Sequence, residues 1–146
     1  MATAPASWPA RGFPEEALKS FDRALALNPN PTDWVNRGSV LIDLGRIDEA
    51  IASYDKAIAI DAKSPAPHFI RANALRDAKR HDEALAGYDR AIKEAQDFVP
   101  AHRARASLLE TMGRADEARA SNERAAALEA LAEQQKRGSA TAAIRR

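Results

Sequence analysis

Residues 31–64 read PTDWVNRGSVLIDLGRIDEAIASYDKAIAIDAKS, and this stretch recurs, degraded but in register, before and after itself. Ala50, Ala84 and Ala118 follow one another at a spacing of 34 residues, and the tyrosine of the first unit has a counterpart at the same interval. A fixed period of this length is typical of stacked supersecondary units. We therefore expect a row of repeats in which each unit contacts its neighbours, and not one domain around a central core.

Each unit is expected to form two helices joined near its middle. Gly45 suits the end of the first helix, because glycine takes a positive φ without a steric penalty. The third unit has Gly113 at this place, whereas the second has Lys79 and a less well specified turn. The predicted helices of the three units are Thr32–Leu44 and Ile47–Ile60, Ala66–Ala78 and His81–Ala95, and Pro100–Met112 and Ala115 onward.

A half unit precedes the first whole one, and its helix is predicted over Pro14–Leu27. Residues 1–13 are predicted to form an irregular arm, because Pro5 and Pro9 each remove a backbone donor. The last helix is predicted to end near Lys136, before a disordered tail. The predicted layout is a repeat domain over 14–137, made of the half repeat 14–30, the repeats 31–64, 65–98 and 99–132 and a helical extension to 136, followed by the tail 138–146.

Composition narrows the class of protein. The 22 basic and 21 acidic residues leave a formal net charge of +1, which gives no electrostatic reason to expect nucleic acid or a membrane surface as a partner. The absence of cysteine removes disulfides and cysteine metal sites. The first residues lack the pattern of a secretory signal, and no stretch approaches the roughly 18 apolar residues of a membrane span. A soluble, cytoplasmic protein is the expectation.

With its columns aligned, the chain resembles the tetratricopeptide repeat family over residues 12–130. The resemblance rests on an aromatic and then a small residue in the first helix, and on small and aromatic residues in the second: Trp34 and Gly38, then Ala50, Tyr54 and Ala57. It implies an all-α, right-handed superhelical stack of helix-turn-helix repeats, about three and a half in number, whose first helices line a concave groove. The variant with NRGSVL and EALAGYDRAI is similar to bacterial arrays, some of them fused to glycosyltransferase domains.

The histidines and the paired carboxylates are interpreted as structural. His68 and His102 share one column, and a helix-packing distance of about 8–10 Å between them is too long for a common metal ion. Acidic pairs begin the second helices, where anions stabilise a helix start by about 0.3–1 kcal/mol each. These pairs are Glu15-Glu16, Asp48-Glu49, Asp82-Glu83 and Asp116-Glu117. With no nucleophile elbow and no phosphate loop in the sequence, we predict no catalytic residue, no metal site and no cofactor, and we do not expect an enzyme.

A column of arginines, Arg37, Arg71 and Arg105, occupies a place where the family more often has an apolar residue. Two interpretations stay open. The long side chains either lie over neighbouring helices and reach acidic partners there, or they contact a ligand.

The concave groove is the binding site that the resemblance implies. The predicted partner-binding residues are Val35, Asn36, Ser39, Phe69, Ile70, Asn73, Arg76 and Arg103. Asn36 and Asn73 offer donors and acceptors to an extended peptide, and the apolar members can receive an apolar side chain. A solvated surface without a ligand is the alternative. The family's two-carboxylate clamp does not match, because its Lys and Asn positions fall on Val35 and Ser39, so a C-terminal Glu-Glu-Val-Asp type tail is not expected.

The two ends of the array differ in polarity. Arg119 and Asn122 give the last repeat a polar outer face, as terminal repeats need. At the other end Leu18, Phe21 and Leu25 form an apolar stripe whose partner helix is replaced by the arm. We expect this N-terminal face to be covered, either by the arm folding back or by a second protein, which can be another copy of the chain.

Together these features predict a non-enzymatic protein–protein interaction module that binds a peptide or protein partner through the concave groove, the open N-terminal face or both. One alternative is a homo-oligomerising structural scaffold, such as a homodimer, completed by a neighbouring copy. Another is the helical fragment of a glycosyltransferase-type enzyme that carries repeats. Neither nucleic acid nor membrane is among the predicted partners.

Overall fold

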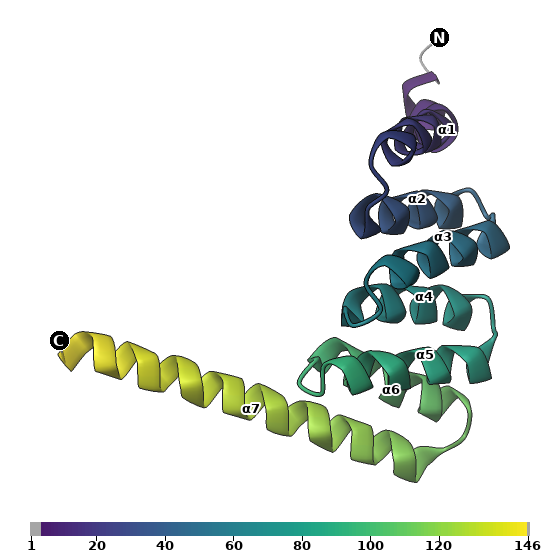
Figure 1. Cartoon of the computed structure of the whole chain (residues 1–146). Helices are drawn as coiled ribbons and strands as arrows, with labels where there is room; N and C mark the ends of the chain where they lie inside the picture. The colour runs from purple at the N-terminus through teal and green to yellow at the C-terminus, as the bar shows by residue number, and fades with distance from the viewer. Residues whose placement is uncertain (1–3, 146) are drawn as a thin grey trace.

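The computed structural model describes residues 4–145, with side chains from residue 13 onward, and this part of the chain is helical apart from short loops. Its helices are α1 (Ala4–Leu27), α2 (Pro31–Asp43), α3 (Ile47–Ile60), α4 (Pro65–Asp77), α5 (His81–Glu94), α6 (Val99–Thr111) and α7 (Ala115–Arg145). Figure 1 shows them stacked, with α2 and α3, α4 and α5, and α6 and α7 as successive helix-turn-helix pairs. The predicted all-α repeat stack is confirmed, and helices α2 to α6 begin and end within one residue of their predicted limits.

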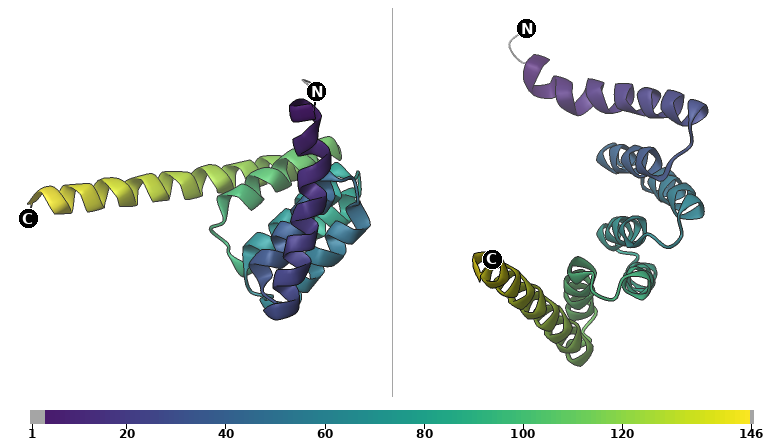
Figure 2. Two further views of the ribbon diagram at one scale, coloured as in Figure 1. Left: turned by 90° about the horizontal axis from the view of Figure 1, so that it is seen from above. Right: turned by 60° about the vertical axis from the view of Figure 1, so that its left-hand side comes forward.

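The stack is curved, and the first helix of each pair lies on the inside of the curve. Figure 2 shows α2, α4 and α6 along the inside and α3 and α5 along the outside. The contacts agree, because α4 touches both α2 and α6, whereas α3 and α5 do not touch each other within the described chain. We call the exposed side of α2, α4 and α6 the inner surface.

Large rings packed against small residues form the centre of each pair. Tyr54 is 2% exposed and Tyr88 is 0% exposed, and both lie in second helices. The first helices place Gly38 and Ala72 in the corresponding small-residue column, and both are buried. Small residues at this column thus let the two helices of a repeat approach closely enough to bury a whole tyrosine ring between them.

The turn inside each pair has the same backbone shape in all three repeats. Gly45, Lys79 and Gly113 have φ values of 75°, 65° and 76°. In the second turn, Lys79 N–H donates to Arg76 O and Arg80 N–H donates to Leu75 O, each at 2.9 Å, which are the hydrogen bonds of a Schellman cap. The second repeat therefore keeps the glycine conformation but places a lysine in it.

Lys79→Gly is expected to raise the free energy of unfolding by about 1 kcal/mol. The left-handed conformation costs a non-glycine residue about 1–2 kcal/mol, and the greater freedom of glycine in the unfolded chain offsets part of the gain. Urea denaturation followed by far-UV circular dichroism measures the change. Lys79→Ala is the matched control, because it removes the same side chain and keeps the strain. An equal gain from both variants would assign the effect to the lysine charge instead.

The structure corrects the prediction at the N-terminus. α1 begins at Ala4, so residues 4–13 are not an irregular arm. Pro5 lies in the first turn, where a helix needs no N–H donor. Pro9 lies further inside and costs the helix about 3 kcal/mol through a lost hydrogen bond and a clash with the preceding turn, but it does not end α1. The backbone of these residues continues α1 and does not fold back over it (Figure 2). Residues 1–3 of the predicted arm lie outside the described residues.

The C-terminal prediction is also wrong, because α7 continues through Gly138 to Arg145. Ala140, Ala142 and Ala143 follow the glycine, and adding a residue to an existing helix is far easier than starting one. The predicted disordered tail is therefore helical over 138–145, and residue 146 lies outside the described residues. Although α7 has 31 residues, neither it nor any other described helix is apolar enough along its length to cross a membrane.

The open N-terminal face is formed by other residues than predicted. Leu18 and Leu25 are each only 6% exposed, so the prediction is wrong for both. They lie on the row of α1 that faces α2, where Leu18 joins the core cluster of Leu41 and Tyr54. Phe21 is half-buried on a neighbouring row of the helix, and it alone of the three predicted side chains keeps a partly open surface.

Candidate functional site

One arginine on each first helix holds successive repeats together. Nε of Arg37 on α2 donates to Oδ1 of Asp22 on α1 at 2.7 Å. The same bond recurs between Arg71 and Asp55 at 2.7 Å and between Arg105 and Asp89 at 2.6 Å. The arginine side chains are 22–27% exposed, so they lie over the neighbouring helices as the first interpretation of this column expected. The arginine column thus links each repeat to the one before it.

The middle repeat differs from the other two at this place. Arg37 and Arg105 also donate from Nη1 to a serine of the following helix, Ser53 and Ser121, each at 2.6 Å. In the second repeat the serine is replaced by Gly87, whose own Cβ would lie 2.8 Å from the Cβ of Ala72. The glycine therefore leaves room for the side chain of Ala72, and it leaves a hollow beside Arg71.

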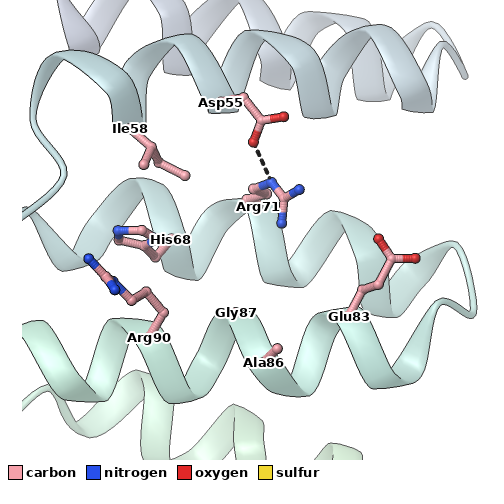
Figure 3. A pocket seen from close by; sticks show the side chains of 8 residues that line it. All are labelled: Asp55, Ile58, His68, Arg71, Glu83, Ala86, Gly87 and Arg90. Atoms are coloured by element: carbon pink, nitrogen blue, oxygen red, sulfur yellow. Dashed lines mark hydrogen bonds and ion pairs between the residues drawn. The ribbon is translucent and has the colours of Figure 1, made fainter.

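Figure 3 shows this hollow, a cavity of about 360 Å³ in which Arg71 points toward Asp55 and Arg90 lies near His68. Its lining consists of Asp55, Ile58, His68, Arg71, Glu83, Ala86, Gly87 and Arg90. Each charged group already has an opposite charge beside it, because Glu83 pairs with Arg80 at 2.9 Å and Arg90 with Glu94 at 3.1 Å. The cavity contains none of the predicted partner-binding residues, and its charges are satisfied within the chain.

Three of the four acidic pairs lie at helix starts as the sequence indicates, whereas Glu15-Glu16 lies inside α1, which begins at Ala4, so the prediction is wrong for that pair. Arg114 donates from Nε and Nη2 to the two carboxylate oxygens of Glu117, each at 2.8 Å, at the start of α7. Arg46 with Glu49 and Arg80 with Glu83 form the same pair at the starts of α3 and α5. These hydrogen bonds lower the pKa of each glutamate. A carboxylate bound in this way at three successive helix starts fixes the turn.

The two column histidines hold loops. Nε2 of His68 lies 3.0 Å from the carbonyl oxygen of Ala62, and Nε2 of His102 lies 2.9 Å from that of Gln96, contacts in which the ring donates. Both rings are buried, as expected for packing residues. Among the described residues no group of three or more His, Cys, Asp or Glu side chains is placed to hold a metal ion.

Three of the predicted partner-binding residues meet at one pocket on the inner surface. Val35 and Asn36 on α2 and Ile70 on α4 line a cavity of about 290 Å³ between these helices. The remaining lining comes from the two helix starts and from the loop between α3 and α4: Pro31, Thr32, Asp61, Ser64, Ala66 and Pro67. We call this cavity the α2–α4 pocket. Asp61 and Ser64 were not among the predicted residues.

Two further predicted residues lie beside tyrosine hydroxyls. Ser39 Oγ is 3.4 Å from the Tyr54 hydroxyl. Asn73 Oδ1 accepts from the Tyr88 hydroxyl at 2.5 Å and from Arg76 Nη1 at 3.4 Å, so its carbonyl is used within the chain. Its amide NH2 stays available to a ligand. Asn36 is exposed, and its side chain makes no hydrogen bond within the described chain.

The last three predicted residues are engaged elsewhere. Phe69 packs against Tyr88 and Phe98, with ring centroids 5.9 Å and 5.3 Å away. Arg76 pairs with Asp77, its neighbour in the chain, at 3.0 Å. Arg103 of α6 donates to Glu129 of α7 at 2.9 Å and is not part of the α2–α4 pocket. A ligand would have to displace these contacts to use the three side chains.

Comparisons with known proteins agree on the fold. A family model described as Tetratricopeptide repeat matches residues 10–65, and a second with the same description matches residues 41–108. A crystal structure of MamA superposes with a TM-score of 0.71 at 22% identity, over 81% of this chain and 70% of that one. MamA from Desulfovibrio magneticus RS-1 gives a TM-score of 0.71 at 16% identity, over 81% and 67% of the two chains. MamA AMB-1 gives 0.65 at 26% identity, over 77% and 62%.

Proposed function

Because the chain belongs to the tetratricopeptide repeat family, we propose that it is a non-enzymatic module that binds an extended segment of a protein partner on its inner surface. The observation that carries this proposal is the α2–α4 pocket, where Val35 and Ile70 offer apolar contact beside the exposed amide of Asn36. Apolar contact combined with a few convergent polar groups is the usual composition of a binding site.

The polar groups of the inner surface suit a peptide backbone. Asn36 offers both a donor and an acceptor on α2, and Asn73 offers its NH2 donor on α4. An extended peptide exposes a carbonyl and an N–H at every residue, so two amides on neighbouring first helices can each pair with it. The side chains between them are then free to enter the pocket.

Peptides selected from a random display library against the whole chain test this proposal. We expect the double variant Asn36→Ala/Asn73→Ala to bind a selected, fluorescently labelled peptide about tenfold more weakly, because each lost hydrogen bond contributes about 0.5–1.5 kcal/mol. The matched control is Lys56→Ala/Lys93→Ala on the outer helices, which should leave fluorescence anisotropy titrations unchanged. Thermal unfolding of both variants checks that the stack is intact.

Selected peptides that bind the double variant as tightly as the wild type, or no selected peptide at all, would contradict binding on the inner surface.

A specific observation supports a second candidate function, a scaffold completed by another copy of the chain. Ala17, Phe21 and Ala24 of α1 are half-exposed, whereas Tyr54 and Ala57, which occupy the aromatic and second small column in the next repeat, are buried. Oligomers that disappear on replacing Phe21 with serine would favour that candidate.

A further inference from the structure

We propose that the α2–α4 pocket is a subsite for a lysine or arginine side chain of the bound segment, a proposal that rests on the function proposed above. Val35, Pro67 and Ile70 give the pocket an apolar wall, and Pro67 is buried. The polar members are Thr32, Asn36, Asp61 and Ser64. Lysine and arginine combine a long apolar stem with a charged head, so such a pocket can cover the stem while the head stays at the polar edge.

The charge of the pocket favours a cation. Asp61 is the one charged residue in the lining, and it forms no ion pair within the described chain. Lys63, two residues later in the same loop, is not part of the lining and makes no salt bridge with it. Asp33, near the start of α2, accepts from Asn30 Nδ2 at 2.8 Å and is outside the pocket. A cationic head beside Asp61 would find an unneutralised carboxylate, unlike in the cavity of Figure 3, where every charge is already paired.

The equivalent place in the next repeat is filled by the chain itself. Val35 and Ser64 are followed 34 residues later by Phe69 and Phe98, whose rings pack edge to face with centroids 5.3 Å apart and an interplanar angle of 82°. The counterpart of Asp61 is Ala95. At the equivalent positions, the interval between α4 and α6 therefore has an aromatic pair and no charged residue, whereas the interval between α2 and α4 has a cavity and a carboxylate.

The α2–α4 pocket depends on particular side chains and not on the backbone of the repeat. The backbone repeats, and the helices that form both intervals have the same lengths of 13 residues. Thr32 and Asn36 are likewise followed by Ala66 and Ile70, so all four polar positions of the pocket become alanine or a larger apolar residue one repeat later. The α2–α4 pocket is open and acidic because its side chains differ, and the chain itself shows how to close it.

Short blocked peptides test the proposal directly. The probes are acetyl-Ala-Ala-Lys-Ala-Ala-amide, its norleucine counterpart of equal stem length, and its glutamate counterpart, each titrated into the whole 15N-labelled chain. The backbone amides of Thr32, Asn36 and Ser64 report binding by chemical shift. We expect the lysine peptide to bind about tenfold more tightly than the norleucine peptide, because the lysine ammonium can form a charge-assisted hydrogen bond to Asp61 that the methyl end of norleucine cannot form. The glutamate peptide should cause no saturable shift.

Two variants separate charge from space. Asp61→Asn, in an exposed loop position, should bring lysine and norleucine peptides to within about twofold of each other, since the wall is unchanged and the charge is gone. Ser64→Phe copies the side chain found one repeat later and should abolish shifts with both peptides. Asp97→Asn, in the loop between α5 and α6, is the matched control and should leave binding of the lysine peptide unchanged.

The outcomes distinguish the two proposals. Equal binding of lysine and norleucine peptides by the wild type, or a preference for lysine that survives Asp61→Asn, would overturn the basic subsite while library-selected peptides still bind the inner surface. Failure of both the probes and the library to give any ligand would overturn the inner-surface function as well. Loss of lysine binding in Asp61→Asn and Ser64→Phe but not in Asp97→Asn supports the subsite.

Discussion

Tyr88→Ala is expected to lower the free energy of unfolding by about 3–5 kcal/mol, the usual cost of removing a buried aromatic side chain. Tyr88 is 0% exposed and lies in a cluster with Leu75, Leu85 and Leu109. Its ring also packs against Phe69 at a centroid distance of 5.9 Å. The cluster thus joins helices of two successive repeats, so removal of this side chain weakens the coupling between repeats that a stack depends on.

Tyr88→Phe is the control that separates ring from hydroxyl. Burial raises the pKa of Tyr88, so the phenol is neutral near pH 7 and donates to Asn73. Phenylalanine keeps the ring and loses this bond, which should cost only about 0.5–1.5 kcal/mol. Urea denaturation followed by far-UV circular dichroism measures both variants. If alanine cost no more than phenylalanine, the ring would contribute little and the described packing of the second repeat would be wrong.

The interior of the array could be predicted from the sequence because each repeat restates the same packing. Columns such as that of Ala50 and that of Tyr54 recur in helices that are buried between two neighbours, so the repeated positions in the sequence are the packed positions in the structure. The predicted limits of α2 to α6 therefore agree with the observed ones within one residue. At the ends no neighbouring repeat imposes that pattern. There Pro9 and Gly138 both lie inside helices, because extending an existing helix outweighs the cost of one unfavourable residue.

The sequence predicted the residues of the inner surface that lie on helices, but not those that lie in the loops between them. The family register placed Val35, Asn36 and Ile70 on the first helices, and the structure brings them to one pocket. Asp61 and Ser64 were missed because they lie between helices, where the register says nothing. A signal was present in the sequence, since the next repeat has alanine and phenylalanine at these positions while the helix columns stay similar.

The contact of Phe69 was also missed because it involves a residue outside the helices. As a residue of the groove register it was expected to receive an apolar side chain of a ligand, yet it packs against Phe98, which comes from the residue just before α6. For the arginine column the sequence left two interpretations, and the choice needed the positions of Asp22, Asp55 and Asp89 on the preceding helices. Contacts between elements decided both cases.

Gly38→Ala is expected to destabilise the chain by about 1–3 kcal/mol, the range for overpacking a filled core, even though alanine favours a helix by about 1 kcal/mol over glycine. A Cβ at this position would lie 2.5 Å from Cε1 and 2.8 Å from Cδ1 of Tyr54. The ring is 2% exposed and belongs to the core cluster with Leu18 and Leu41, so it has no open space to move into.

The reverse substitution in the next repeat supplies the matched control, because Ala72 stands where Gly38 does. Ala72→Gly should also destabilise, by about 1 kcal/mol, through the lower helix propensity of glycine. Urea denaturation should therefore show a lower free energy of unfolding for both variants. The cause is excess side-chain volume in Gly38→Ala and greater backbone freedom in Ala72→Gly. Stabilisation by Gly38→Ala would show that propensity outweighs contact here, and that Tyr54 can yield without loss of packing. We therefore expect glycine to be the better residue at position 38, beside Tyr54, and alanine to be the better residue at position 72, in the repeat of Tyr88.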